Sequence, residues 1–199
     1  MVELNERIRT LFARDIEAKI ALVDVITPTI VKAGQHLVDC LLNDGKIFIC
    51  GHEGTTVNSL HFSAAMLHGF EVERPSLPVI NLSGEASLLS ALAHNDNADQ
   101  VFARQIRALG QEKDVLIVLT ATGQSKHLLQ LITAAHDKHI DIIALTGHDG
   151  GLVATQLNSN DIEIRIPSQQ FAHIQEMHLF ILHCFCDLID RSLFGTHHH

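Results

Sequence analysis

Tryptophan and tyrosine are both absent from the 199 residues, and nine phenylalanines are the only benzene-ring side chains. Such a chain lacks the broad aromatic platform on which single-stranded bases stack. Basic residues are also scarce, because 14 Lys and Arg stand against 23 Asp and Glu, which gives a net charge of −9. A generic nucleic-acid-binding protein needs a basic face, so the composition argues against this class.

Long apolar runs are missing as well. None reaches the roughly 18 residues that a membrane helix needs, and residues 1–6 are acidic and lack the apolar core of a signal peptide. The four cysteines match no zinc motif, and their apolar neighbours predict buried, reduced thiols: Cys40, Cys50, Cys184 and Cys186. We therefore expect a cytoplasmic protein. The histidine run at 197–199 is interpreted as a tag remnant and is left out of the site.

Short apolar runs alternate with longer stretches of helical period. Near-continuous Val, Ile and Leu runs are typical of parallel strands buried on both faces. We expect such strands at 46–50, 78–82, 115–119 and 142–145. A fifth strand at 161–166 alternates polar and apolar residues, which predicts a half-exposed strand at an edge of the sheet.

Helices are expected between and outside these strands. One spans about 125–138 and begins at the hydroxyl of Ser125. Two helices, at about 4–25 and 28–43, precede the first strand, and a long one spans about 173–191. The apolar arc of the last helix is wider than one sheet face can cover, so we interpret the terminal helices as oligomer-forming surface. The pattern predicts a single domain at 1–196, folded as a doubly wound three-layer α/β/α sandwich.

Two loops at the ends of predicted strands carry small hydroxyl residues and glycine. The first is Gly-His-Glu-Gly-Thr-Thr at 51–56, and the second is Thr-Ala-Thr-Gly-Gln-Ser at 120–125. Each leads into a helix, where free backbone N–H groups and the helix dipole favour a phosphate monoester. The alternative is that Thr55, Thr122 and Ser125 are ordinary helix caps. Neither loop is a P-loop or a dinucleotide fingerprint, because the required Lys and glycine spacing are missing.

These motifs resemble the SIS (sugar isomerase) domain family, in particular the subgroup of phosphoheptose isomerases (GmhA type) and the replication-initiation regulator DiaA. The landmarks cover nearly the whole chain. They are the segments at 58–62, 73–78, 120–125, 144–151, 163–167 and 174–178. The resemblance implies a flavodoxin-like fold with a five-stranded parallel sheet, a phosphosugar ligand and a homotetramer.

The resemblance also implies roles for single residues. The sugar phosphate would be held by four hydroxyls: Thr55, Thr120, Thr122 and Ser125. His61, Gln175 and His183 match the family's catalytic or zinc-binding positions. Without the resemblance, single histidines on largely apolar helices are more often packed and hydrogen-bonded than catalytic, and this interpretation applies to His61 and His183.

Three departures separate the chain from the enzymes of that subgroup. The Glu that follows the histidine by one helical turn is Ala65, and an Asp before Gln175 is Ala172. An alanine cannot supply the base that aldose–ketose isomerisation needs. The first loop also carries Glu53 where the family has a small residue. Ala65, Ala172 and the Met-His pair at 177–178 resemble DiaA, whereas His183 resembles the enzymes, so the sequence lies between the subgroups and nearer DiaA. Without the Glu, the remaining three residues form only a weak zinc set.

Two functions follow from these observations. The first is a regulator that binds phosphosugars and the initiator DnaA without catalysis, with Leu193 and Phe194 as a partner contact or as a helix end docked on its own domain. The alternative is a phosphoheptose isomerase that converts sedoheptulose 7-phosphate to D-glycero-D-manno-heptose 7-phosphate. It would need a substitute base, for which Glu53 is the candidate and Glu176 a weaker one. A segment at 94–96 is a further candidate for lining the sugar pocket.

Overall fold

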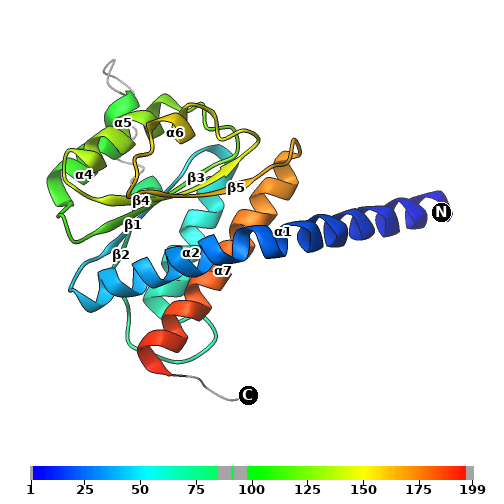
Figure 1. The fold of residues 1–199 in the computed structure, drawn as a ribbon, viewed down its shortest axis with the longest axis horizontal. Coiled ribbons are helices and arrows are strands. Elements are labelled where there is room, and N and C mark those ends of the chain that lie inside the picture. The colour runs from blue at the N-terminus through cyan, green and yellow to red at the C-terminus, as the bar shows by residue number, and fades with distance from the viewer. Residues whose placement is uncertain (1, 85–90, 92–97, 196–199) are drawn as a thin grey trace.

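Five parallel strands form one sheet between two layers of helices (Figure 1). The computed structural model describes residues 2–84, 91 and 98–195. The strands are β1 (Ile47–Gly51), β2 (Val79–Asn81), β3 (Val115–Thr120), β4 (Asp141–Gly147) and β5 (Ile162–Ile166). Their order across the sheet is β2-β1-β3-β4-β5. This is the order of a flavodoxin-like doubly wound sheet, so the predicted fold class is confirmed.

The helices divide between the two faces of the sheet. One face is covered by α1 (Val2–Leu42), α2 (Thr56–His68) and α7 (Phe171–Phe194), and the other by α4 (Val101–Leu109), α5 (Lys126–His136) and α6 (Gly151–Gln156). Alternate strand residues enter the two cores, so Ile47 and Ile117 lie under α1 and α7 while Phe48 and Leu116 lie under α4 and α5. Short 3-10 turns are η1 (Glu53–Thr55), η2 (Leu82–Gly84) and η3 (Ala98–Gln100).

β5 lies at an edge of the sheet, as its alternating sequence predicts. Its residues alternate between buried and more exposed positions, with Arg165 exposed. The segment at 94–96 and the histidine run at 197–199 lie outside the described residues.

The N-terminal region differs from the prediction of two helices. It is a single helix, α1, which continues through Pro28. A proline inside a helix removes one hydrogen bond and costs about 3 kcal/mol. Buried residues on both sides of Pro28 repeat at helical spacing and pack into the core: Ile26, Ile30, Ala33 and Leu37. Because one continuous helix keeps all four on the same face, packing outweighs the local effect of the proline.

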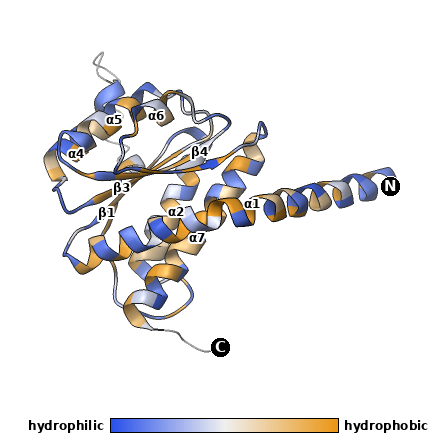
Figure 2. Ribbon diagram, in the orientation of Figure 1, coloured by the Kyte–Doolittle hydropathy of each residue, from blue (hydrophilic) through white to orange (hydrophobic). Residues whose placement is uncertain are grey.

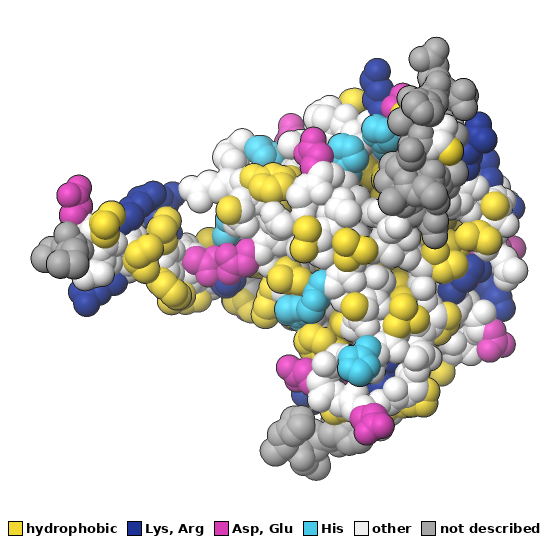
Figure 3. Space-filling model, turned by 180° about the vertical axis from the view of Figure 1, so that it is seen from behind, with side chains coloured by type: hydrophobic (Ala, Val, Ile, Leu, Met, Phe, Trp, Pro, Cys, Tyr) yellow, Lys and Arg dark blue, Asp and Glu magenta, His cyan; other side chains and the backbone are white. Residues whose placement is uncertain are grey.

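The first half of α1 projects from the rest of the chain as an arm (Figure 1). Apolar and polar residues alternate along it (Figure 2), and apolar side chains lie on its surface (Figure 3). The large exposed apolar side chains recur every four residues: Leu4, Ile8, Phe12, Ile16 and Ile20. A contiguous apolar stripe exposed on a helix is typical of an interaction surface. Over the described part of the chain, no helix is long and apolar enough to cross a membrane.

The cysteines are free thiols inside the fold. Cys40, Cys50 and Cys186 are buried, and Cys184 is partly buried. Burial raises the pKa of Cys40 to about 11 and the pKa values of Cys50 and Cys186 to about 12. These thiols are therefore protonated and unreactive at neutral pH, in agreement with the prediction of buried, reduced cysteines.

Candidate functional site

The two predicted ligand loops lie side by side at the carboxyl edge of the sheet. β1 and β3 are neighbours in register, with Gly51 opposite Leu119. The backbone N–H of His52 donates to the carbonyl of Leu119 at 3.3 Å, which ties the first loop to the end of β3. Gly51 lets the first loop fold closely back on itself, because a Cβ there would lie 2.3 Å from the carbonyl oxygen of Thr55. The sheet therefore brings both loops to one place.

Thr55 uses its hydroxyl to hold the first loop together. The side chain is fully buried, and its Oγ1 lies 2.7 Å from the carbonyl of His52 and 3.0 Å from that of Leu119. The same oxygen accepts the N–H of His52 at 3.0 Å. The one hydroxyl proton is thus directed at the protein's own backbone. A phosphate contact from this hydroxyl stays a prediction, and it would require the loop to open.

Ser125 in the second loop is different. It is the residue before α5 and 8% exposed, and its Oγ has no hydrogen-bond partner among the described residues. An unsatisfied buried hydroxyl costs about 1–3 kcal/mol. Thr122 is exposed at the tip of the loop, while Thr120 accepts the N–H of Gly123 at 3.0 Å. A phosphate oxygen beside α5 would supply the partner that Ser125 lacks.

His61 and His183 come together from two helices. His61 on α2 and His183 on α7 approach with their Nε2 atoms 2.9 Å apart and their rings edge to face. One Nε2 therefore carries the proton that the other accepts. Burial lowers the pKa of His183, the nearby His61 lowers it further, and Glu71 acts in the opposite direction. The pair shares one proton in this hydrogen bond, which suits a group that donates to and accepts from a sugar oxygen.

Gln175 lies against the first loop rather than in the histidine pair. Its amide donates to the carbonyl of Gly54 at 3.0 Å, and Asn58 donates to the carbonyl of Gln175 at 2.8 Å. Gln175 and His183 are eight residues apart on α7, about 12 Å along the helix. The structure therefore joins the predicted residues into a row that runs from the loops, past Gln175, to His61 and His183.

Carboxylates are sparse around this row. The turn after His61 carries Ala65, whose carbonyl accepts a hydrogen bond from buried Arg74 at 3.1 Å. Glu53 is exposed, with a positive φ of 57°, and its side chain has no hydrogen bond to a described residue. Glu176 points to α1, where it accepts from Lys19 at 2.6 Å. The roles of Glu53 and Glu176 as bases stay predictions.

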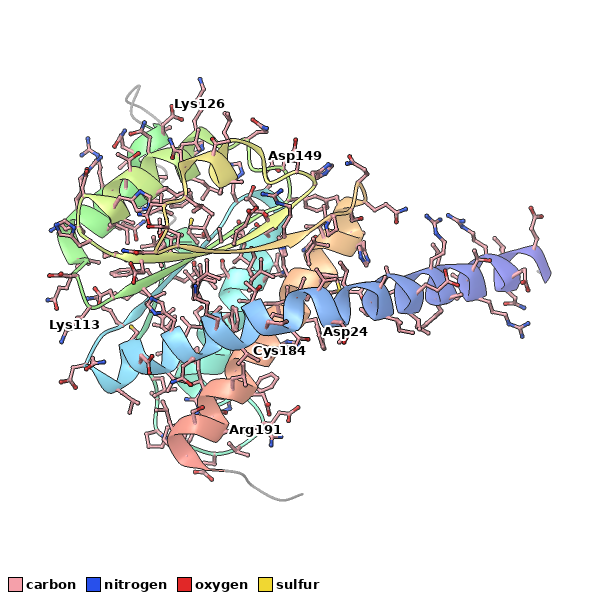
Figure 4. The ribbon with its side chains drawn as sticks, viewed as in Figure 1. Asp24, Lys113, Lys126, Asp149, Cys184 and Arg191 are labelled. Carbon is pink, nitrogen blue, oxygen red and sulfur yellow. The ribbon has the colours of Figure 1, made fainter. Side chains whose placement is uncertain are left out.

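One carboxylate close to this row, that of Glu71, is not predicted from the sequence. Glu71 lines a groove of about 780 Å³ between α1, α7 and the segment after α2, and His183 lines the same groove. The neighbouring Phe70 ring lies 5.2 Å from the His183 ring. Figure 4 marks Cys184 on the α7 wall of this groove, near the point where α1 crosses α7. No local sequence motif identifies Glu71, because its position depends on how the segment after α2 packs against α7.

The donor set does not fit a structural or catalytic zinc ion. His61 and His183 supply imidazoles, but the third predicted ligand, Gln175, is an amide already bonded to Gly54. Within residues 2–84, 91 and 98–195, no group of three His, Cys, Asp or Glu side chains is placed to hold a metal. A catalytic zinc site needs three good protein ligands. We therefore derive no step through a metal.

The end of α7 docks on its own domain. Leu193 is half-buried against the core, and the Phe194 ring lies 5.8 Å from the guanidinium carbon of Arg74. Arg74 is in turn held by Asp190 and by the carbonyl of Met66. The structure thus gives Leu193 and Phe194 the second of the two roles considered from the sequence. Their role as a partner contact stays untested.

Comparison with known proteins agrees with this geometry. The model of the SIS domain family matches residues 12–147. The chain is 45% identical to the phosphoheptose isomerase of Chromohalobacter salexigens, over 98% of this chain and 99% of that one. It is 43% identical to the phosphoheptose isomerase of Coxiella burnetii, over 96% of each chain.

A solved structure gives the same result. The phosphoheptose isomerase from Francisella tularensis superposes with a TM-score of 0.90 and 41% identity, over 96% of this chain and all of that one. These names agree with the isomerase alternative of the sequence analysis rather than with its regulator interpretation, and the closer likeness to DiaA is not confirmed. Because the family model covers more than half of the chain and the relatives cover nearly all of it, the protein belongs to the SIS domain family.

Proposed function

We propose that the protein binds a phosphosugar along the row from Ser125 to the histidine pair and isomerises it. The observation that carries this proposal is the hydrogen bond between His61 and His183, 2.9 Å long. Such a pair can pass one proton between the two oxygens that exchange roles in an aldose–ketose isomerisation. The relatives are named phosphoheptose isomerases, which supports a heptose phosphate as the substrate class. Within that class, we propose sedoheptulose 7-phosphate as the substrate and D-glycero-D-manno-heptose 7-phosphate as the product.

The residues divide the work along the row. Ser125 and Thr122, with the first N–H groups of α5, bind the phosphate. Gln175 keeps the first loop in place through Gly54. His61 and His183 deliver a proton to the carbonyl oxygen of the ketose and remove one from the neighbouring hydroxyl.

The test is incubation of the purified protein with sedoheptulose 7-phosphate, followed by separation of the heptose phosphates. We expect product from the wild-type protein and at least a hundred-fold loss in His183→Gln, the scale of general acid–base catalysis. His68→Gln is a matched control, because His68 is an exposed histidine at the end of α2 and lies outside the pair. Absence of product from the wild-type protein would contradict the proposal.

A second candidate function is favoured by Ala65. With no carboxylate one turn after His61, the same site can bind a phosphosugar without turning it over, as a DiaA-like regulator that binds the initiator DnaA would. Immobilised protein exposed to purified DnaA, with and without sedoheptulose 7-phosphate, tests this candidate. Binding of DnaA together with no turnover would favour the regulator over the isomerase.

We further propose that a second copy of the chain covers the α1 arm and that the assembly is a homotetramer. The support is the exposed apolar stripe on a helix that projects away from its own sheet. A self-complementary helix face is the usual basis of symmetric association. Light scattering should give the mass of four chains, and Ile8→Glu with Phe12→Glu should reduce it. A wild-type mass of one chain would contradict this assembly.

A further inference from the structure

The isomerase proposed above has a histidine pair but no identified base at carbon. The reaction moves a proton from C1 to C2 of the sugar, and this step needs a group that first accepts it. Ala65 cannot do so, and Glu53, which is exposed like Glu71, lies on the first loop at the phosphate end of the row. The reacting carbons of a heptulose 7-phosphate lie at the opposite end of the molecule from the phosphate. A base is therefore needed beyond the histidine pair.

We propose that Glu71 is this catalytic base, an inference that rests on the proposed isomerase function. Glu71 and His183 line the same groove of about 780 Å³, on the side of the histidine pair away from the loops. The order of contacts along α7 supports this direction, because Gln175 meets Gly54 of the first loop and His183 lies two turns further on.

The other charged groups of the groove are already paired. Lys19 of α1 donates to Asp15 and Glu176, and Asp187 of α7 accepts the Nε of Arg191 at 2.9 Å. Glu71 has neither a hydrogen bond nor an ion pair with any residue that the structure describes. Of the two carboxylates that line the groove, Glu71 and Asp187, Glu71 is thus the one free to take a proton.

The chemistry balances with these groups alone. The Glu71 carboxylate removes a proton from C1, and the electron pair of that C–H bond forms the C1=C2 bond of an enediol. The carbonyl electrons move to the C2 oxygen, which takes a proton from the histidine pair. In the second half, the histidine pair removes the proton of the C1 hydroxyl, a C1=O bond forms, and Glu71 returns its proton to C2. No oxidant, reductant or metal is consumed.

The surroundings of Glu71 suit this role. In the sequence, Phe70 lies between the end of α2 and Glu71. The Phe70 ring packs on His183. Glu71 raises the pKa of His183 against the lowering effects of burial and of His61. The shared groove is the geometric basis for placing Glu71 and His183 on one substrate, whose C1 and O2 are neighbours.

The test compares Glu71→Gln with Glu73→Gln. Glu73 is an exposed glutamate two residues further on, has no assigned role and provides the matched control. We expect Glu71→Gln to lower kcat at least a hundred-fold while sedoheptulose 7-phosphate still raises its melting temperature, and Glu73→Gln to behave as wild type. Glu71→Asp should retain part of the activity, because the shorter side chain still carries a carboxylate.

The outcomes separate the two proposals. An active wild-type protein whose Glu71→Gln variant keeps its kcat would overturn the role of Glu71 and leave the isomerase intact. In that case the same assay on Glu53→Gln tests the earlier candidate. A wild-type protein that binds the sugar phosphate without any turnover would overturn the isomerase, and the role of Glu71 with it.

Discussion

Thr55 in the first loop and Ser125 in the second are both buried hydroxyls that precede a helix at the same edge of the sheet. The Thr55 hydroxyl bonds to its own backbone, whereas the Ser125 hydroxyl has no partner among the described residues. The first loop therefore satisfies its own buried hydroxyl, whereas the second loop leaves one unsatisfied. We expect the unpaired hydroxyl, and not the paired one, to be available to a ligand.

The largest effect is expected from the glycine that shapes the second loop. Gly123 has a φ of +68°, and a Cβ on it would lie 2.0 Å from the carbonyl oxygen of Gly150. Gly123→Ala should lower the free energy of unfolding by about 3 kcal/mol or more, because backbone strain and overlap add. Urea denaturation measures this, with Gly84→Ala as the control, since a Cβ on Gly84 meets nothing within 4 Å. Equal stabilities would contradict the described loop.

The pH dependence of stability tests the buried environment of His178. His178 is fully buried, its Nε2 donates to the carbonyl of Thr146 at 3.1 Å, and burial lowers its pKa to about 4. Because the unfolded chain binds a proton at higher pH than the folded one, stability falls as pH drops from 7 toward 4. The His178 contribution to this loss is about 2 kcal/mol between pH 7 and pH 5. His178→Gln should flatten the slope, and an unchanged slope would contradict this.

Thr55→Val tests whether the Thr55 hydroxyl stabilises the first loop. It removes the hydroxyl bonds to the backbone and should lower the free energy of unfolding by about 1–2 kcal/mol. Thr133→Val is the control, because Thr133 is an exposed threonine on α5 with a similar bond to a helix carbonyl. If both variants lose the same small amount, Thr55 does not tie the loops together.

Ser125→Ala tests the second loop and is the one change of the four that should cause no loss of stability. An unpaired buried hydroxyl is itself destabilising, so its removal should leave the free energy of unfolding unchanged or raise it. The effect should appear instead in ligand binding, where the rise of melting temperature with sedoheptulose 7-phosphate is reduced. A substantial loss of stability without ligand would mean that Ser125 is a structural cap like Thr55.

The sequence predicts the features that depend on local patterns and misses those that depend on contacts between distant segments. Strands such as β3 follow from apolar runs with no competing pattern, and their alternation with helices predicts a doubly wound sandwich. The flavodoxin-like arrangement of the sheet comes from the resemblance to the SIS domain family. The continuity of α1 does not follow, because a local rule about Pro28 opposes long-range packing by Ile26 and Ile30. In the site, hydroxyls in the loops are visible in the sequence, but their pairing is not. Glu71 is invisible for a related reason, since a returning segment brings it to His183.

Proton transfer at the carbons of the sugar is the most direct test of the proposed isomerase function. We expect sedoheptulose 7-phosphate incubated with the protein in deuterium oxide to gain deuterium at C1 of the recovered ketose and at C2 of the aldose, read by NMR and mass spectrometry. His183→Gln should abolish both signals. A wild-type protein that leaves the sugar free of deuterium and forms no aldose, under conditions where the same sugar raises its melting temperature, would contradict the account.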